Sequence, residues 1–220
     1  MVLGLNERRL TFLLQAILLV EMVASFWRGQ WLTGVATTAI IIVTLTPQFL
    51  ARRFRVHIPS QFQLMAIAFV FASLFLGEIR DYYGRFSWWD TALHTMSGFL
   101  LGIVGFLLVH VLNEVERVGV HMKPGFVAFF AFLFALGVGT LWELFEFAMD
   151  VFFGMNMQKP MFGDMSGLTD TMMDLLVDAI GALVISIMGY RHLKHGEQSF
   201  LMRWIAHFVE RNPRLFGRSR

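Results

Sequence analysis

The feature that most constrains this chain is a series of six apolar stretches, each close to the length that a helix needs to cross a bilayer. The hydrocarbon core is about 30 Å thick, so a spanning helix takes about 20 predominantly apolar residues. Only helices and closed barrels satisfy every backbone group in lipid. We therefore predict an all-α, polytopic bundle of membrane helices. The predicted spans are residues 10–27, 31–50, 62–83, 89–112, 126–153 and 171–190.

The composition supports this fold class. Hydrophobic residues make up 56% of the chain and charged residues 15%, whereas a soluble domain carries about 25% charged residues. Cysteine is absent, which excludes disulfides, a thiolate nucleophile and a cysteine-based zinc site. We expect residues 1–192 to form a single transmembrane domain. Residues 197–212 are expected to form a cytoplasmic amphipathic helix, because apolar residues recur there at helical spacing among basic ones.

The distribution of Lys and Arg predicts the orientation. Fourteen of the 18 basic residues lie in the N-terminal segment, in the second and fourth connections and in the C-terminal tail. The positive-inside rule then places both termini in the cytoplasm, which agrees with an even number of spans in the cell (inner) membrane. Because these residues lie between and after the apolar stretches, they indicate topology and contact with membrane lipids, not a nucleic-acid-binding face.

Acidic residues show the opposite bias and gather in the last three spans. Eleven of the 16 fall in predicted outer halves of helices or in outer connections. Ionisable groups are expensive inside a membrane and mark a functional site by default. The predicted site faces the outer side and comprises seven carboxylates and one imidazole: Asp90, His94, Glu143, Glu146, Asp150, Asp170, Asp174 and Asp178.

The spacing of these residues places them on one face of each helix and predicts layers. Side chains three, four or seven positions apart share a helix face. If neighbouring spans are antiparallel, successive layers lie about 6 Å apart in depth. From the outside inward, the predicted layers are Asp90, Asp150 and Asp170; His94, Glu146 and Asp174; and Ser97, Glu143 and Asp178. We expect the middle layer to supply the catalytic groups.

The donor set indicates a divalent metal ion. Few basic side chains lie on the outer side, so bound cations, shared protons or water must balance the carboxylates. An oxygen-rich set with one imidazole suits Mg²⁺, Mn²⁺, Ca²⁺ or iron, and zinc also accepts such ligands. Asp170 and Asp178 lie about 12 Å apart along one helix, so either two ions bind or some groups hydrogen-bond to others. The alternative is a set of hydrogen-bonded carboxylates that line a wet vestibule without chemistry.

Three other features surround the predicted site. On the outer side, Arg80 and Arg85 are expected to pair with Glu78 and Asp81. An outer segment with methionines at 155, 157, 161 and 165 either binds Cu(I) through its thioethers or fills irregular contacts, and the second interpretation is favoured. Five glycines in the spans are predicted close-packing positions: Gly98, Gly102, Gly105, Gly137 and Gly139.

Three motifs in the second half of the chain carry a family resemblance. They are Trp89-Asp90-Thr91-x2-His94-x2-Ser97-Gly98, Trp142-Glu143-x2-Glu146-Phe147 and Asp170-Thr171-x2-Asp174-x3-Asp178-x2-Gly181-Ala182. In this order they resemble the YjdF-type family of small inner-membrane proteins. A more distant similarity is to VanZ-like proteins, but this chain has Asp178 where that pattern has Asn and Glu146 where it tends to have Gln. The resemblance implies the fold and the site, and it implies no reaction.

The residues support three classes of function. The first is a metal-dependent hydrolase of a lipid or lipid-linked substrate, with His94, Glu146 and Asp174 as catalytic groups. The second is a cation or proton transporter that uses the acids as a path. The third is an accessory subunit whose polar cleft binds a partner helix or a quinone. Because the helices turn apolar beyond Glu143 and Asp178, a site open on one side is favoured over a path through the membrane.

Overall fold

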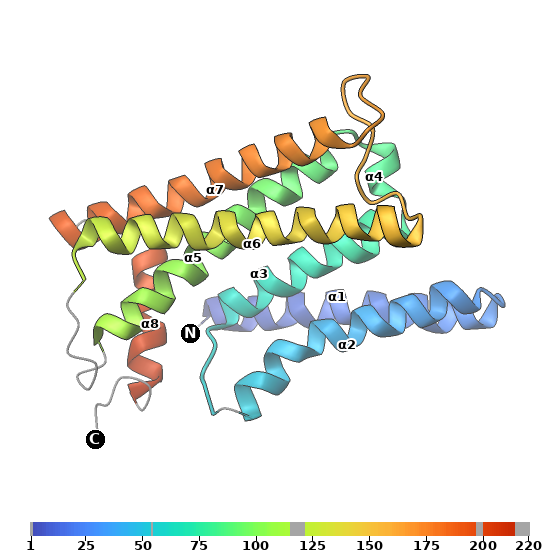
Figure 1. The fold of residues 1–220 in the computed structure, drawn as a ribbon. Coiled ribbons are helices and arrows are strands. Elements are labelled where there is room, and N and C mark those ends of the chain that lie inside the picture. The colour runs from blue at the N-terminus through green and yellow to red at the C-terminus, as the bar shows by residue number, and fades with distance from the viewer. Residues whose placement is uncertain (1, 54, 115–121, 197–199, 214–220) are drawn as a thin grey trace. The chain divides into compact units, whose positions relative to one another are not determined.

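The computed structural model describes residues 2–53, 55–114, 122–196 and 200–213, which form long helices joined by short connections (Figure 1). The chain divides into two compact units, Met1–Trp89 and Asp90–Arg220. Within the described ranges there is no β-strand, only an isolated bridge between Met161 and Asp164. The prediction of an all-α membrane helix bundle is therefore confirmed.

Six helical segments in the described part of the chain are long and apolar enough to cross a membrane. They are Asn6–Trp27, Trp31–Arg53, Ser60–Ile79, Trp89–Val109, Pro124–Phe153 and Leu168–His195. The third ends at Ile79 instead of at the predicted residue 83. The helix stops there because Asp81 adopts a left-handed backbone conformation (φ 58°), which interrupts the hydrogen-bonded turns.

The described residues of the first unit form the helical segments α1 (Val2–Trp27), α2 (Trp31–Arg53), α3 (Ser60–Val70), the π-helix η1 (Phe71–Ile79) and α4 (Tyr82–Arg85). The helices α1 and α2 lie side by side (Figure 1). The turn between them uses Gly29 at φ 72°, a conformation that glycine adopts without steric cost. The core of the unit is formed by Leu18, Ile40, Phe71 and Phe75.

The ion pair of Arg80 differs from the prediction. Its Nη2 atom lies 2.6 Å from Oε2 of Glu21 on α1, and Nη2 of Arg28 lies 2.9 Å from Oε1 of the same carboxylate. Arg80 follows η1, where its own amide donates to the carbonyl of Phe75 five residues earlier. This wide turn ends the helix beside α1, so the partner comes from a distant part of the chain instead of from Glu78 or Asp81.

The second unit carries the predicted site. It contains α5 (Trp89–Glu114), α6 (Pro124–Phe153), α7 (Leu168–His195) and α8 (Phe200–Arg211). The helices α6 and α7 run side by side along most of their length and are joined by the loop 154–167 (Figure 1). Helix α6 starts with Pro124 in its first turn and ends at Gly154 (φ 62°). Helix α8 falls within the predicted amphipathic segment, of which residues 197–199 lie outside the described residues.

Glycines bring the backbones of the second unit into direct contact. A Cβ atom added to Gly98 on α5 would lie 2.1 Å from the carbonyl oxygen of Asp178 on α7. One added to Gly181 would lie 2.4 Å from the carbonyl oxygen of Thr95, and one added to Gly139 on α6 would lie 2.5 Å from Oδ2 of Asp178. These contacts fix the axial register of the three helices at Asp178. By contrast, Gly137 has open space around it, so its predicted close-packing role is wrong.

Candidate metal centre

The centre of the polar site is the imidazole of His94, one helical turn into α5. Its Nε2 atom lies 3.7 Å from Oδ1 of Asp90, 3.7 Å from Oε1 of Glu143 and 3.9 Å from Oδ2 of Asp174. Asp90 precedes His94 by one turn of the same helix, Glu143 comes from α6 and Asp174 from α7. Three helices of one unit therefore direct carboxylates at one imidazole nitrogen.

The other nitrogen of the ring has a different partner. Nδ1 of His94 lies 3.3 Å from Oδ2 of Asp178, whose Oδ1 accepts a hydrogen bond from the hydroxyl of Ser97. An ionised carboxylate can only accept, so this contact requires the proton of a neutral imidazole to be on Nδ1. In the neutral ring, the lone pair of Nε2 then faces Asp90, Glu143 and Asp174. Asp178 thus orients the ring in the way that carboxylates orient metal-binding histidines.

Burial makes the carboxylates of this group unusual. The exposed fraction is 3% for Glu143 and 0% for Asp174. Both oxygens of each side chain lack a hydrogen bond of good geometry among the described residues, although the Thr171 hydroxyl lies near Glu143. Native proteins pair nearly all buried polar atoms, because leaving a charged group unpaired in an apolar interior costs several kcal/mol. Four such oxygens around one imidazole require a cation or protons to balance their charge.

The geometry of the donor atoms fits a single ion. Asp90, His94 and Asp174 each offer one atom, and these three atoms all lie within 4.8 Å of one another. Donors bound to one first-row divalent ion at about 2.0–2.2 Å lie about 3–4 Å apart. Small side-chain rotations therefore suffice to close the site. Glu143 lies beside these three residues, where it could serve as a fourth donor or as a proton acceptor.

Glu146 occupies a different place from the one that the layering predicts. Its Oε1 atom accepts a hydrogen bond from Nε1 of Trp142 at 2.9 Å, and its exposed fraction is 9%. Glu143, one turn away on α6, takes the position beside His94 instead. The reason is the axial register of α6 against α7, which is set by the close contact of Gly139 with Asp178. The donor Trp142, four residues before Glu146, could have been found from its helical spacing.

Two of the predicted carboxylates, one near the end of α6 and one near the start of α7, bind the loop that joins these helices. Asp150 accepts from the backbone amides of Met157 at 2.7 Å and Gln158 at 2.9 Å. Asp170 accepts from the amide of Lys159 at 2.6 Å through Oδ2, while its Oδ1 is buried without a partner. The structure therefore brings five of the eight predicted ligands together, His94 and the four carboxylates around its ring, and uses Asp150 and Asp170 to hold the loop. Sequence reasoning missed these amides, because backbone donors carry no residue signature.

The same loop contains a second carboxylate-centred turn. Asp164 accepts from the hydroxyl of Ser166 at 2.7 Å and its amide at 2.8 Å, and from the hydroxyl and amide of Thr169 at 2.8 and 3.0 Å. These donors, the Ser166 hydroxyl first, hold the pKa of the Asp164 carboxyl well below its usual range. The turn leads directly into α7, so it helps to place Asp170 and Asp174.

The fold and the site define a class of protein: an integral membrane helix bundle with a buried carboxylate–histidine group. Comparison with known families is consistent with this. The chain belongs to the family DUF2238, described as "Predicted membrane protein", whose model matches residues 7–195 and so includes all the site residues. A relative from Thermotoga maritima, named "Uncharacterized protein", is 26% identical over 186 residues, which cover 84% of this chain and 91% of the relative. No solved structure matches the chain.

Proposed function

We propose that the protein is a membrane metalloprotein whose second unit binds a divalent ion at His94, and that this centre hydrolyses a lipid or lipid-linked substrate. The observation that carries the metal site is the set of unpartnered oxygens of Glu143 and Asp174 beside Nε2 of His94. Asp90, His94 and Asp174 are the proposed ligands. Three protein ligands with an open position are typical of catalytic metal sites, whereas structural sites are closed.

The chemistry of the donor atoms narrows the choice of metal ion. Two carboxylates and one imidazole suit Mn²⁺, Fe²⁺ or Zn²⁺ better than Ca²⁺, which takes six to eight oxygen ligands. Mg²⁺ keeps several waters and uses few protein ligands, so it remains a weaker candidate. Asp178 serves the site by holding the Nδ1 proton of His94, not as a ligand.

The proposed reaction is hydrolysis, and the roles of the side chains follow from their positions. A divalent ion in this site supplies Lewis acidity and lowers the pKa of a bound water. Glu143, with both oxygens unpartnered, is placed to accept a proton there. Glu146 lies one turn along the same helix and is held by Trp142, so it can receive that proton through water or position the substrate. Substrate enters past Asp90, whose side chain is 19% exposed, whereas Asp174 is fully buried.

Packing beyond the site favours one-sided chemistry over transport. Beyond Asp178, the buried positions of α7 are Gly181, Ala182, Ile185, Ser186 and Gly189, and the single hydroxyl of Ser186 is the polar side chain among them. On α5 the buried residues Ile103 and Phe106 continue this apolar layer. An ion or proton path needs polar groups or water along its length. We further propose that the site opens to the outer face and that the protein is of the YjdF type, in agreement with the family assignment.

Elemental analysis of the purified protein tests the metal site. We expect about one equivalent of a transition metal in the wild type and a large loss in Asp174→Asn. The matched control is Asp164→Asn, which removes an acid from the outer loop. Metal content that is equal in wild type and Asp174→Asn would refute the site.

The reaction needs its own test. The metal-loaded protein is incubated with short-chain phospholipids and with a polyprenyl phosphate ester, and released product is measured with and without chelator. Turnover that is abolished in Glu143→Gln, while metal is retained, supports hydrolysis. Turnover unchanged in Glu143→Gln would refute the proposed role of Glu143 as proton acceptor.

A further inference from the structure

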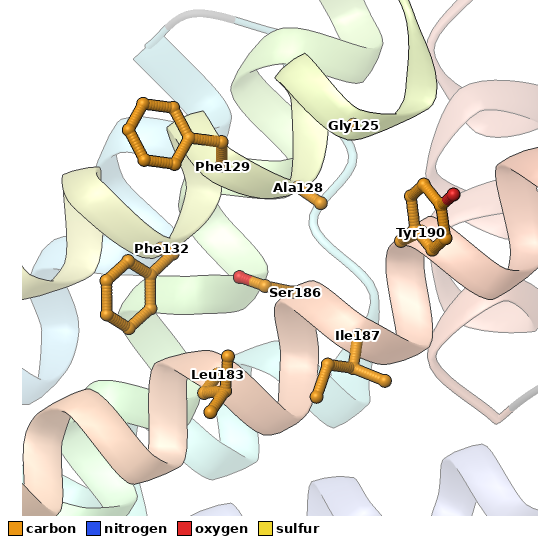
Figure 2. A pocket seen from close by; sticks show the side chains of 8 residues that line it. All are labelled: Gly125, Ala128, Phe129, Phe132, Leu183, Ser186, Ile187 and Tyr190. Carbon is orange, nitrogen blue, oxygen red and sulfur yellow. The ribbon is translucent and has the colours of Figure 1, made fainter.

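A groove lies between α6 and α7 at the end of the second unit that is remote from the metal centre. Its volume is about 270 Å³. Figure 2 shows Phe129 and Phe132 of α6 on one side and Leu183 and Ile187 of α7 on the other. Ser186, which also lines it, lies eight residues beyond Asp178, or about 12 Å along the helix. The groove is therefore separate from the carboxylate–histidine group.

Ser186 is the buried polar group of this groove. It is 4% exposed, and its hydroxyl has no hydrogen-bond partner among the described residues. Hydroxyls in apolar helices usually donate to a carbonyl one turn earlier, as Thr140 does to Leu136 and Thr95 to Thr91, each at 2.8 Å. Figure 2 shows the Ser186 hydroxyl directed into the space between the two helices. An unpaired hydroxyl in an apolar environment raises the free energy of the folded protein. A ligand with a hydrogen-bond acceptor at the depth of Ser186 would remove this cost.

The mouth of the groove is positively charged. Tyr190 lines the groove, and its hydroxyl accepts a hydrogen bond from Nζ of Lys194 at 2.7 Å. On the other helix, the exposed Lys123 immediately precedes α6 and lies two residues before the lining residue Gly125. The amino end of α6 adds its partial positive charge. An anionic group is therefore favoured at this end.

We propose that the α6–α7 groove binds one anionic phospholipid, with its phosphate between Lys123 and Lys194, an ester carbonyl on the Ser186 hydroxyl and an acyl chain along Phe132 and Leu183. Ser186 lies one to two turns, about 6–12 Å, from Tyr190 and Lys194. This matches the order of phosphate, ester and acyl chain in a phospholipid.

Native mass spectrometry of the full chain in detergent tests the proposal. The protein is titrated with phosphatidylglycerol and with phosphatidylcholine that carry the same acyl chains. We expect the anionic lipid to bind more tightly. Ser186→Ala should weaken its binding about threefold to tenfold, the value of one hydrogen bond. Lys123→Gln and Lys194→Gln should each weaken it about fivefold and reduce the preference over the neutral lipid.

Two tryptophan variants show whether the lipid lies in the groove. Ala128→Trp fills it and should abolish tight binding, whereas Leu141→Trp, at a 65% exposed position of the same helix, should leave binding unchanged. Equal binding of both lipids, or Ala128→Trp with wild-type affinity, would overturn the proposal. So would a quinone that copurifies with the wild type and that phosphatidylglycerol fails to displace. If Ala128→Trp does not fold, wild-type affinity in the conservative Ser186→Ala variant overturns it instead.

Discussion

Replacing Asp178 with asparagine tests how the metal centre is built. Asparagine has almost the same shape, so the packing against Gly98 and Gly139 is kept, but its amide lacks the charge that holds the Nδ1 proton of His94. Removing such a partner from a metal-binding histidine typically weakens metal affinity about 10–100-fold, or about 1.4–2.7 kcal/mol. Asp174→Asn, which removes a proposed ligand, should weaken metal affinity more than Asp178→Asn does.

The assay is a competition titration of Mn²⁺ and Zn²⁺ against a fluorescent chelator, with the protein in mild detergent. The exposed Glu210→Gln variant on α8 serves as the control for a lost negative charge far from His94 in sequence. We expect the order wild type and Glu210→Gln, then Asp178→Asn, then Asp174→Asn. Two results would refute the reasoning. Wild-type affinity in Asp178→Asn would show that the contact to His94 has no role, and an affinity as low as that of Asp174→Asn would make Asp178 a ligand.

Three further predictions concern the framework of the site. Gly98→Ala places a Cβ 2.1 Å from a backbone oxygen of α7 and should lower both the melting temperature and the metal content. Gly137→Ala places its Cβ in open space and should change neither the melting temperature nor the metal content measurably. Asp150→Ala releases the amides of Met157 and Gln158, so limited proteolysis should cut the loop 154–167 faster while metal is retained. An unchanged cleavage rate would show that the hydrogen bonds to Asp150 do not hold the loop. Because the pKa of Asp164 is lowered by folding, its contribution to loop stability is complete at neutral pH and is lost as the pH falls below about 4. Hydrogen exchange at Thr169 should show this loss, and Asp164→Asn should remove the pH dependence.

The sequence alone determined the membrane class and the faces of the site. The length of an apolar run decides whether a helix can span a bilayer, and this property is local, so the six spans follow from the sequence. The helical period likewise puts Asp90 and His94 on one face of α5, and their 3.7 Å contact lies within one helix. Charged residues that lie at helical spacing in apolar runs were therefore sufficient to locate the site to three helices.

The tertiary structure decided which side chains meet across the helices. Glu143 instead of Glu146 faces His94, although the two differ by less than one turn of α6. That difference depends on the axial register of the three helices. The register is set where Gly98 lies against the backbone of Asp178 and Gly139 lies against its side chain. Spacing along each chain segment contains no information on a shift between segments. Loop amides and distant partners, such as Glu21 for Arg80, are decided in the same way, because backbone donors and long-range contacts exist only once the helices have packed.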